Sequence, residues 1–172
     1  MNTFDLRSGA YVLDTTACGI GFRARHVIGP AVVGRFAQFD GNADLSGDLS
    51  QWRVDVAIRA DSIDTGNRQR DELLCAKFLR TPDYPTIEFV STAARDVGES
   101  TVELVGDLSI RGITKSTAVT FQRHAAADGL VHMTGTAVID RRDWQVNWNA
   151  ATKVSIGKTV ALEFDITAAQ RA

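Results

Sequence analysis

Apolar and polar residues alternate with a period of two along most of the chain. In residues 102–110, Val102, Leu104 and Leu108 fall on one side and Glu103 falls on the other. Such spacing places successive side chains on opposite faces of a β-strand, with one face toward a core. The same pattern predicts further strands at residues 10–14, 19–26, 33–39, 52–60, 86–91, 118–123, 131–139 and 160–167.

Glycine, asparagine and aspartate gather between several of these predicted strands. Residues 40–42 read Asp-Gly-Asn, residues 46–48 read Ser-Gly-Asp, residues 97–99 read Val-Gly-Glu, and Asp-Gly occupies 128–129. These residues favour turns, because they tolerate positive φ or bond to their own backbone. We therefore expect strands joined in sequence as hairpins.

One stretch departs from the period of two. Residues 67–79 place Leu74 and Phe78 four positions apart and contain no glycine, proline or β-branched residue, which is typical of a helix. Two prolines follow shortly after the stretch and prevent the helix from continuing. The residues placed to cap its start are Asp64, Thr65 and Asn67.

The number and spacing of the strands predict an all-β fold. About eight to ten antiparallel strands favour a barrel or a sandwich, since closure or stacking hides the unpaired edges of so many strands. The strand count alone does not separate these two architectures. With no internal repeat or long linker, residues 1–172 are expected to form a single domain.

Composition and charge reduce the number of functional classes that fit the chain. Apolar residues make up 44% of the chain, charged residues 23%, and the formal net charge is -2, so an ordinary globular protein is expected. The chain has no stripe of basic residues that would indicate nucleic-acid binding. It also has no apolar run long enough for a transmembrane helix. The first residues lack the pattern of a secretory leader, which predicts a cytoplasmic protein, although a secreted chain whose leader had been removed would look the same.

Few residues suggest catalytic or metal chemistry. His26, His124 and His132 have no metal-ligand spacing, and Cys18 and Cys75 are expected to be buried free thiols. The chain has no nucleophile elbow, dinucleotide fingerprint or phosphate loop. No metal or cofactor is predicted. The carboxylate pairs Asp61 with Asp64 and Asp140 with Asp143 are better explained as anchors of loops than as acid-base groups.

His26 and the aromatic residues have a more specific interpretation. His26 is in phase with Ile20 and Phe22, so it is expected to point inward at the end of its strand. There it would meet the polar head of a ligand or bond to backbone at a barrel rim. The aromatic side chains are spread over many strands, as the wall of a hollow barrel or the core of a filled one requires.

Several segments in order resemble the YceI-like family of lipocalin-like barrels, which is associated with binding polyisoprenoid lipids. The late segment Asp140-Arg-Arg-Asp-Trp144 is similar to a family motif that usually ends in Phe. The chain departs from the family pattern at Ala17-Cys18, where His-Ser is common, and at Leu73, where a histidine usually follows Arg-Asp. Roles of those histidines are not carried over. The other matching segments are residues 11–14, 20–26, 33–36, 39–41, 60–67, 70–71, 84–91 and 106–115.

The resemblance implies an antiparallel lipocalin-like barrel of about eight strands with one short helix near its mouth. It also implies a function: non-enzymatic binding, carriage or storage of an isoprenoid-type amphiphilic lipid in an apolar pore. The residues expected to contact that ligand are Phe22, His26, Phe36, Ile58, Ile63, Phe78, Phe89, Leu108, Trp144, Trp148 and Phe164.

Two alternatives remain at this point. The first is an enzyme acting on an isoprenoid or quinone-like substrate, in which His26, Arg70 or Asp71 supplies the polar chemistry. The second is a barrel with a filled interior that acts through its surface, for example as a homodimer. A lined pore without convergent polar groups favours the binding protein over both.

Overall fold

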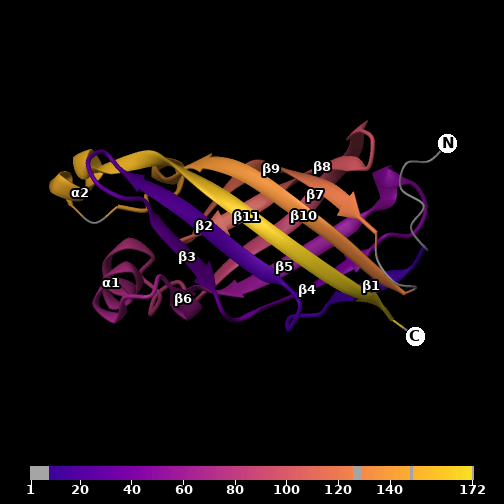
Figure 1. The fold of residues 1–172 in the computed structure, drawn as a ribbon, viewed down its shortest axis with the longest axis horizontal. Helices are drawn as coiled ribbons and strands as arrows, with labels where there is room; N and C mark the ends of the chain where they lie inside the picture. Colours follow the sequence, from indigo (N-terminus) through magenta and orange to yellow (C-terminus); the bar gives the residue numbers. More distant parts are fainter. Residues whose placement is uncertain (1–7, 126–128, 148, 172) are drawn as a thin grey trace.

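The computed structural model describes residues 8–125, 129–147 and 149–171, and they form a closed β-barrel with helices at one end (Figure 1). A single sheet contains all eleven strands and closes on itself where β1 pairs with β11. The strands are β1 (Ala10–Leu13), β2 (Gly19–His26), β3 (Val32–Phe36), β4 (Phe39–Asp44), β5 (Arg53–Arg59), β6 (Ile63–Asp64), β7 (Thr86–Gly98), β8 (Thr101–Ile110), β9 (Ile113–His124), β10 (Leu130–Asp140) and β11 (Ile156–Gln170).

The eleven strands amount to an eight-stranded barrel in which three strands are interrupted. β1 and β2 lie in succession along the same edge of β11, and both are antiparallel to it. Their neighbours follow the same scheme, since β4 pairs with β1 and β3 pairs with β2. β5 and β6 complete it by pairing with β4 and β3. The predicted antiparallel barrel is thus confirmed.

The inward and outward phases of the predicted strands match the structure. Val102, Leu104 and Leu108 are buried, and Phe164 and Leu162 pack against the core from β11. β7 and β9 extend well beyond the predicted segments. In the added parts, residues 92–98 of β7 and 113–117 of β9, the apolar alternation that marks a half-buried strand is weak.

Residues 40–42, predicted as a turn, lie instead within β4. Gly41 is required there by close packing rather than by positive φ. A Cβ at this position would come within 2.8 Å of Leu13 Cδ1 and 2.9 Å of the Asp55 carbonyl oxygen. The glycine therefore allows the Leu13 side chain of β1 and the Asp55 backbone of β5 to approach β4 closely.

The predicted helix is present and sits at one end of the barrel, opposite the two chain termini (Figure 1). It consists of α1 (Arg68–Leu73) followed by a π-helical turn, Leu74–Phe78. Asn67 caps it, and its side-chain oxygen accepts a hydrogen bond from the Arg70 amide at 3.0 Å. Among the described residues, no helix has the length and apolar composition that crossing a membrane requires.

A second short helix, α2 (Ala150–Ser155), has no counterpart among the predicted elements. It lies at the same end of the barrel as α1 (Figure 1). Asn149 and Thr152 form a capping box, in which each side chain accepts a hydrogen bond from the other residue's backbone amide. This local pattern fixes the start of a helix that is too short to show apolar periodicity.

The end of the barrel near the termini is closed by packing. Tyr11, Trp52 and Val102 are buried there together with Leu45 and Val131. A second cluster, centred on residues such as Ile58, Leu108 and Trp144, lies toward the helical end. The interior is therefore filled at one end and bordered by the helices at the other.

Three glycines of the barrel wall lie beneath phenyl rings of neighbouring strands. A Cβ at Gly135 would come within 2.5 Å of the Phe121 ring, and Gly34 lies similarly under Phe22. The third pair is Gly106 with Phe89. Rings seated on glycines lie against the wall, where a larger residue would push them away from it. We call these contacts the glycine–phenylalanine pairs.

Gly106→Ala should lower the free energy of unfolding by about 1–3 kcal/mol. The new methyl would come within 2.6 Å of the Val90 carbonyl oxygen, which is backbone and cannot turn aside as a ring can. Urea denaturation followed by circular dichroism measures the change. Gly19→Ala is the matched control, because nothing lies within 4 Å of a Cβ at Gly19. Equal stabilities of the two variants would contradict the packing described.

Candidate ligand-binding pore

A cavity of about 430 Å³ runs through the helical half of the barrel. This volume lies within the range of about 300–1,000 Å³ that is common for ligand sites. Its wall is almost entirely apolar and draws on nearly every strand. Besides the predicted residues, the apolar side chains of the wall include Leu13, Ile20, Val54, Val56, Leu73, Leu74, Ile87, Leu104, Ile110, Val119, Phe121, Ile139, Val146, Ile156, Val160, Leu162 and Ile166.

Ten of the eleven residues expected to contact a ligand line this cavity. Trp148 is the exception, because it lies outside the described residues. The ten are Phe22, His26, Phe36, Ile58, Ile63, Phe78, Phe89, Leu108, Trp144 and Phe164. Their common place in one wall follows from strand phase, which brings residues distant in sequence to the same inner surface.

Sequence reasoning missed much of the wall contributed by β9, β11 and α1. Val160 and Leu162 share the inward phase of Phe164, so the alternation already contained the signal for them. Phe121 on β9 lies in a segment predicted as a strand, yet its phase was not used. Leu73 of α1 places an apolar side chain on the cavity wall.

Trp144 is held in the wall by a short 3₁₀ turn between β10 and α2, Arg141–Trp144 (η4). Its side chain is 2% exposed, and its indole Nε1 donates a hydrogen bond to the Leu108 carbonyl oxygen at 2.9 Å. Asp140 caps the turn by accepting from the Arg142 amide at 3.0 Å. The turn thus fixes an aromatic side chain against β8.

Arg141 is a buried cation whose donors are used by the protein itself. Its Nε donates to the Gly157 carbonyl at 2.9 Å, and its two terminal nitrogens donate to the carbonyls of Val146 at 2.7 Å and Ile156 at 3.0 Å. It also bonds to the Asn147 side chain. Burial lowers the pKa of the guanidinium. Arg141 therefore ties η4 to the start of β11 and closes the wall between them.

Arg70 and Asp71 are joined through Thr65 at the start of α1. Arg70 Nε donates to Thr65 Oγ1 at 2.8 Å, and a terminal nitrogen donates to the Thr65 carbonyl at 2.7 Å. Asp71 Oδ1 accepts from the Thr65 amide at 2.9 Å and from its hydroxyl at 2.5 Å. Arg70 borders the cavity, whereas Asp71 borders a hollow on the outside of the barrel.

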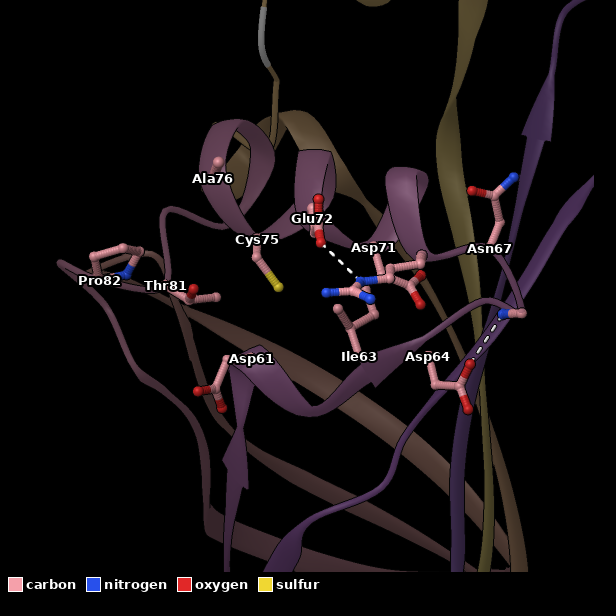
Figure 2. Close-up of a pocket in the computed structure, with 12 residues that line it drawn as sticks. Asp61, Ile63, Asp64, Asn67, Asp71, Glu72, Cys75, Ala76, Thr81 and Pro82 are labelled. Carbon is pink, nitrogen blue, oxygen red and sulfur yellow. Dashed lines mark hydrogen bonds and ion pairs between the residues drawn. The ribbon is translucent and has the colours of Figure 1, made fainter.

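That outer hollow, of about 540 Å³, lies between α1 and β6 and is lined by carboxylates and Cys75 (Figure 2). Asp61 pairs with Arg59, and Asp64 accepts from the Gly66 amide, so both carboxylates anchor local structure. Across the described ranges, no three histidine, cysteine or acidic residues are grouped to hold a metal ion. The carboxylates of the hollow therefore stabilise the local structure around β6 and the start of α1.

The three histidines do not converge. His26 borders the cavity, whereas His124 and His132 face one another across β9 and β10, with ring centroids 5.0 Å apart. His132 Nε2 lies 2.7 Å from an Asp165 carboxylate oxygen, and His124 Nε2 lies 2.7 Å from the Thr134 hydroxyl. Only His26 is placed to meet a molecule inside the barrel.

Both cysteines are free and half-buried rather than fully buried as predicted. Burial is the main cause that raises the pKa of each thiol. Cys18 lies beside β11, where its sulfur is 3.2 Å from both the amide nitrogen and the carbonyl oxygen of Thr167. The residue thus helps to bridge the interruption between β1 and β2.

Comparison with known proteins gives concordant results. A family model described as YceI-like domain matches residues 11–168. A UPF0312 protein of Shewanella denitrificans is 37% identical over 123 residues, which cover 69% of this chain and 63% of the relative. A second, from Shewanella oneidensis, is 33% identical over 125 residues and has the same coverage. The chain thus spans less than two thirds of the length of these relatives.

Two solved structures share the fold. BcnA of Burkholderia cenocepacia has a TM-score of 0.82 at 19% identity, covering 90% of this chain and 98% of that one. A structure from Saccharophagus degradans, described as a polyisoprenoid binding domain, has a TM-score of 0.74 at 18% identity, covering 96% and 100%. At these identities the likeness establishes a common architecture.

Asp140→Asn should lower the free energy of unfolding by about 1 kcal/mol at pH 7, as expected for a partly exposed ion pair. The Arg142 guanidinium lowers the pKa of Asp140 to about 2 from 3.8. A depressed pKa stabilises the fold above the unfolded value, and this contribution is lost as pH falls toward 2. Urea denaturation at pH 7 and at successively lower pH should show the wild-type and Asn proteins converging.

The matched control for this prediction is Asp143→Asn, which removes the same charge from an exposed position of the same turn. It should change stability less at pH 7. If Asp140→Asn and the wild type differ equally at every pH, the contribution assigned to the ionised Asp140 is wrong.

Proposed function

This chain belongs to the YceI-like family, and we propose that its pore binds, carries or stores an isoprenoid-type amphiphilic lipid without catalysing a reaction on it. The observation that carries the proposal is the cavity of about 430 Å³ with an almost wholly apolar wall. We infer that the chain acts as one lipid-binding domain, since all eight strand positions around the barrel contribute residues to the wall of this pore.

The energetics of burial favour a long apolar tail. Each methylene removed from water contributes about 0.8 kcal/mol, so ten such groups would contribute about 8 kcal/mol. That gross value corresponds to a dissociation constant of about 1 μM, before the entropic costs of binding are subtracted. No reactive group is needed for such affinity, and an isoprenoid tail supplies more than enough carbon atoms.

The polar head of the ligand is expected at the helical end of the pore. Arg70 of α1 and His26, which pairs with Ile156 just after α2, both border the cavity and offer hydrogen bonds to acceptor oxygens of a head group. Arg141 also borders the cavity, but its donors already bind carbonyls of the surrounding loops. We therefore propose a head group that carries hydroxyl, carbonyl or phosphate oxygens and sits at the helical end.

The arrangement of polar groups supports binding over catalysis. An enzyme would need at least two groups to converge on one ligand atom. Asp71, one of the candidates, accepts two hydrogen bonds from Thr65 and borders the outer hollow instead of the pore. The cavity itself argues against a filled barrel that acts only through its surface. The Saccharophagus degradans domain, described as polyisoprenoid-binding, adds weight to an isoprenoid ligand.

Native mass spectrometry of the purified protein, with organic extraction of whatever accompanies it, tests this function. We expect one molecule of a long-chain isoprenoid lipid per protein, or saturable uptake of a polyprenyl lipid by delipidated protein. A bare protein that rejects polyprenyl lipids and other long-chain amphiphiles would refute the proposal.

Ala24→Trp should abolish this uptake while the fold remains. Ala24 faces the cavity near His26, and the space is large enough to admit the indole, which would occupy the ligand's path. The stoichiometry measured by native mass spectrometry should fall at least tenfold, with unchanged circular dichroism. Val90→Trp is the matched control, because Val90 is 51% exposed on the outside of β7. Uptake that survives in Ala24→Trp would place the ligand elsewhere.

A further inference from the structure

The hairpin between β2 and β3 carries an exposed apolar tip at the helical end of the barrel. Val27 is 67% exposed and Ile28 is 92% exposed. Gly29 and Pro30 complete the turn, and both are exposed. A β-branched pair at the end of a projecting hairpin contributes nothing to the core. We call Val27 and Ile28 the apolar tip.

Two further exposed apolar side chains, Val33 and Val138, lie on the outside of the barrel in a row of paired residues that includes both strands of this hairpin. Strand register aligns Val138 of β10, Ala161 of β11, Arg23 of β2 and Val33 of β3 in one row. Val138 is 71% exposed and Val33 is 53% exposed. The row lies on four strands whose inner faces border the cavity.

Three cations flank the apolar tip. Arg23 and Arg25 project from β2, and Lys158 lies on the bulged segment of β11 that runs beside Arg25. Within the described ranges, none of the three forms an ion pair. We call them the cationic flank.

The neighbouring carboxylates leave the cationic flank in excess. Asp64 pairs with Arg35. Asp140 pairs with Arg142 and also lies close enough to interact electrostatically with Lys158. Glu163 is exposed on β11, two residues beyond Ala161 and further from the apolar tip. The helical end of this face thus combines apolar side chains with positive charge, although the whole chain has a net charge of -2.

We propose that the apolar tip and the cationic flank dock the barrel onto an anionic lipid bilayer. Apolar side chains enter the boundary between head groups and acyl chains, to a depth of about 5–10 Å, while neighbouring cations contact lipid phosphates. A narrow projecting tip flanked by cations fits such a surface better than it fits the broad, flat core of a protein interface.

Docking at this place would bring the pore to the bilayer. Ala24, His26 and Val32 lie on the two strands of the same hairpin and border the cavity. A ligand drawn from the membrane would then enter the apolar pore without crossing bulk water. The docking goes beyond lipid binding by the pore, and it does not require the pore to be occupied.

Vesicle flotation tests the apolar tip. Wild-type protein should float with vesicles that contain phosphatidylglycerol and bind weakly to vesicles of phosphatidylcholine alone. Ile28→Asp should lower the partition coefficient at least tenfold, since burial of one isoleucine is worth about that factor or more. Val97→Asp is the matched control, because Val97 is 47% exposed on β7 near the opposite end of the barrel.

The charge contribution has its own variants. Arg23→Gln and Arg25→Gln should each lower partition onto phosphatidylglycerol vesicles about fivefold, the factor expected for one cation at an anionic surface. Added salt should reduce wild-type partition and narrow these differences, because the charges are exposed. Arg171→Gln, near the chain termini, should have little effect.

The pore-blocked variant Ala24→Trp separates docking from uptake of lipid. It should float as the wild type does, while Ile28→Asp should still take up polyprenyl lipid from detergent solution. The proposal is overturned if wild-type protein ignores both kinds of vesicle, as a surface built for a protein partner would. It is equally overturned if Ile28→Asp floats normally, or if Ala24→Trp no longer floats.

Discussion

Closure of the sheet through β11 is the constraint on which the rest of the structure depends. β10 pairs with one edge of this long strand, and β2 and β1 share the other. This closure pairs strand edges that an open sheet would leave free. Once the ring is closed, the inward phase of each strand determines the composition of the interior, and an apolar inward phase yields an apolar pore.

The two ends of the barrel differ in what lies between the strands. Near the termini, Tyr11, Trp52 and Val102 are buried in a packed cluster inside the barrel. At the other end, the connections between strands are long enough to contain α1, α2 and η4, and these border the cavity instead of filling it (Figure 1). Arg141 keeps one of these connections in place through carbonyls on both sides of α2.

Local and periodic features were predictable from the sequence. The inward faces of residues 102–110 and 160–167 follow from alternation, and the helix over 67–79 follows from apolar spacing and from the absence of helix breakers. Contacts between distant segments were not predictable. Gly41 suggested a turn, whereas it actually accommodates Leu13 and the backbone at Asp55, far away along the chain. Whether the barrel is hollow or filled depended on similar long-range contacts, between rings and glycines.

The glycine–phenylalanine pairs make the bore of this barrel adjustable at single positions. In a closed sheet, strand number and stagger determine the diameter of the backbone cylinder. Here the space left inside also depends on which wall positions lack a side chain, since a ring seated on Gly34, Gly106 or Gly135 occupies less of the lumen than one displaced by a methyl group. Exchanging glycine and small residues along the wall would therefore retune the pore for thinner or bulkier tails while the topology stayed the same.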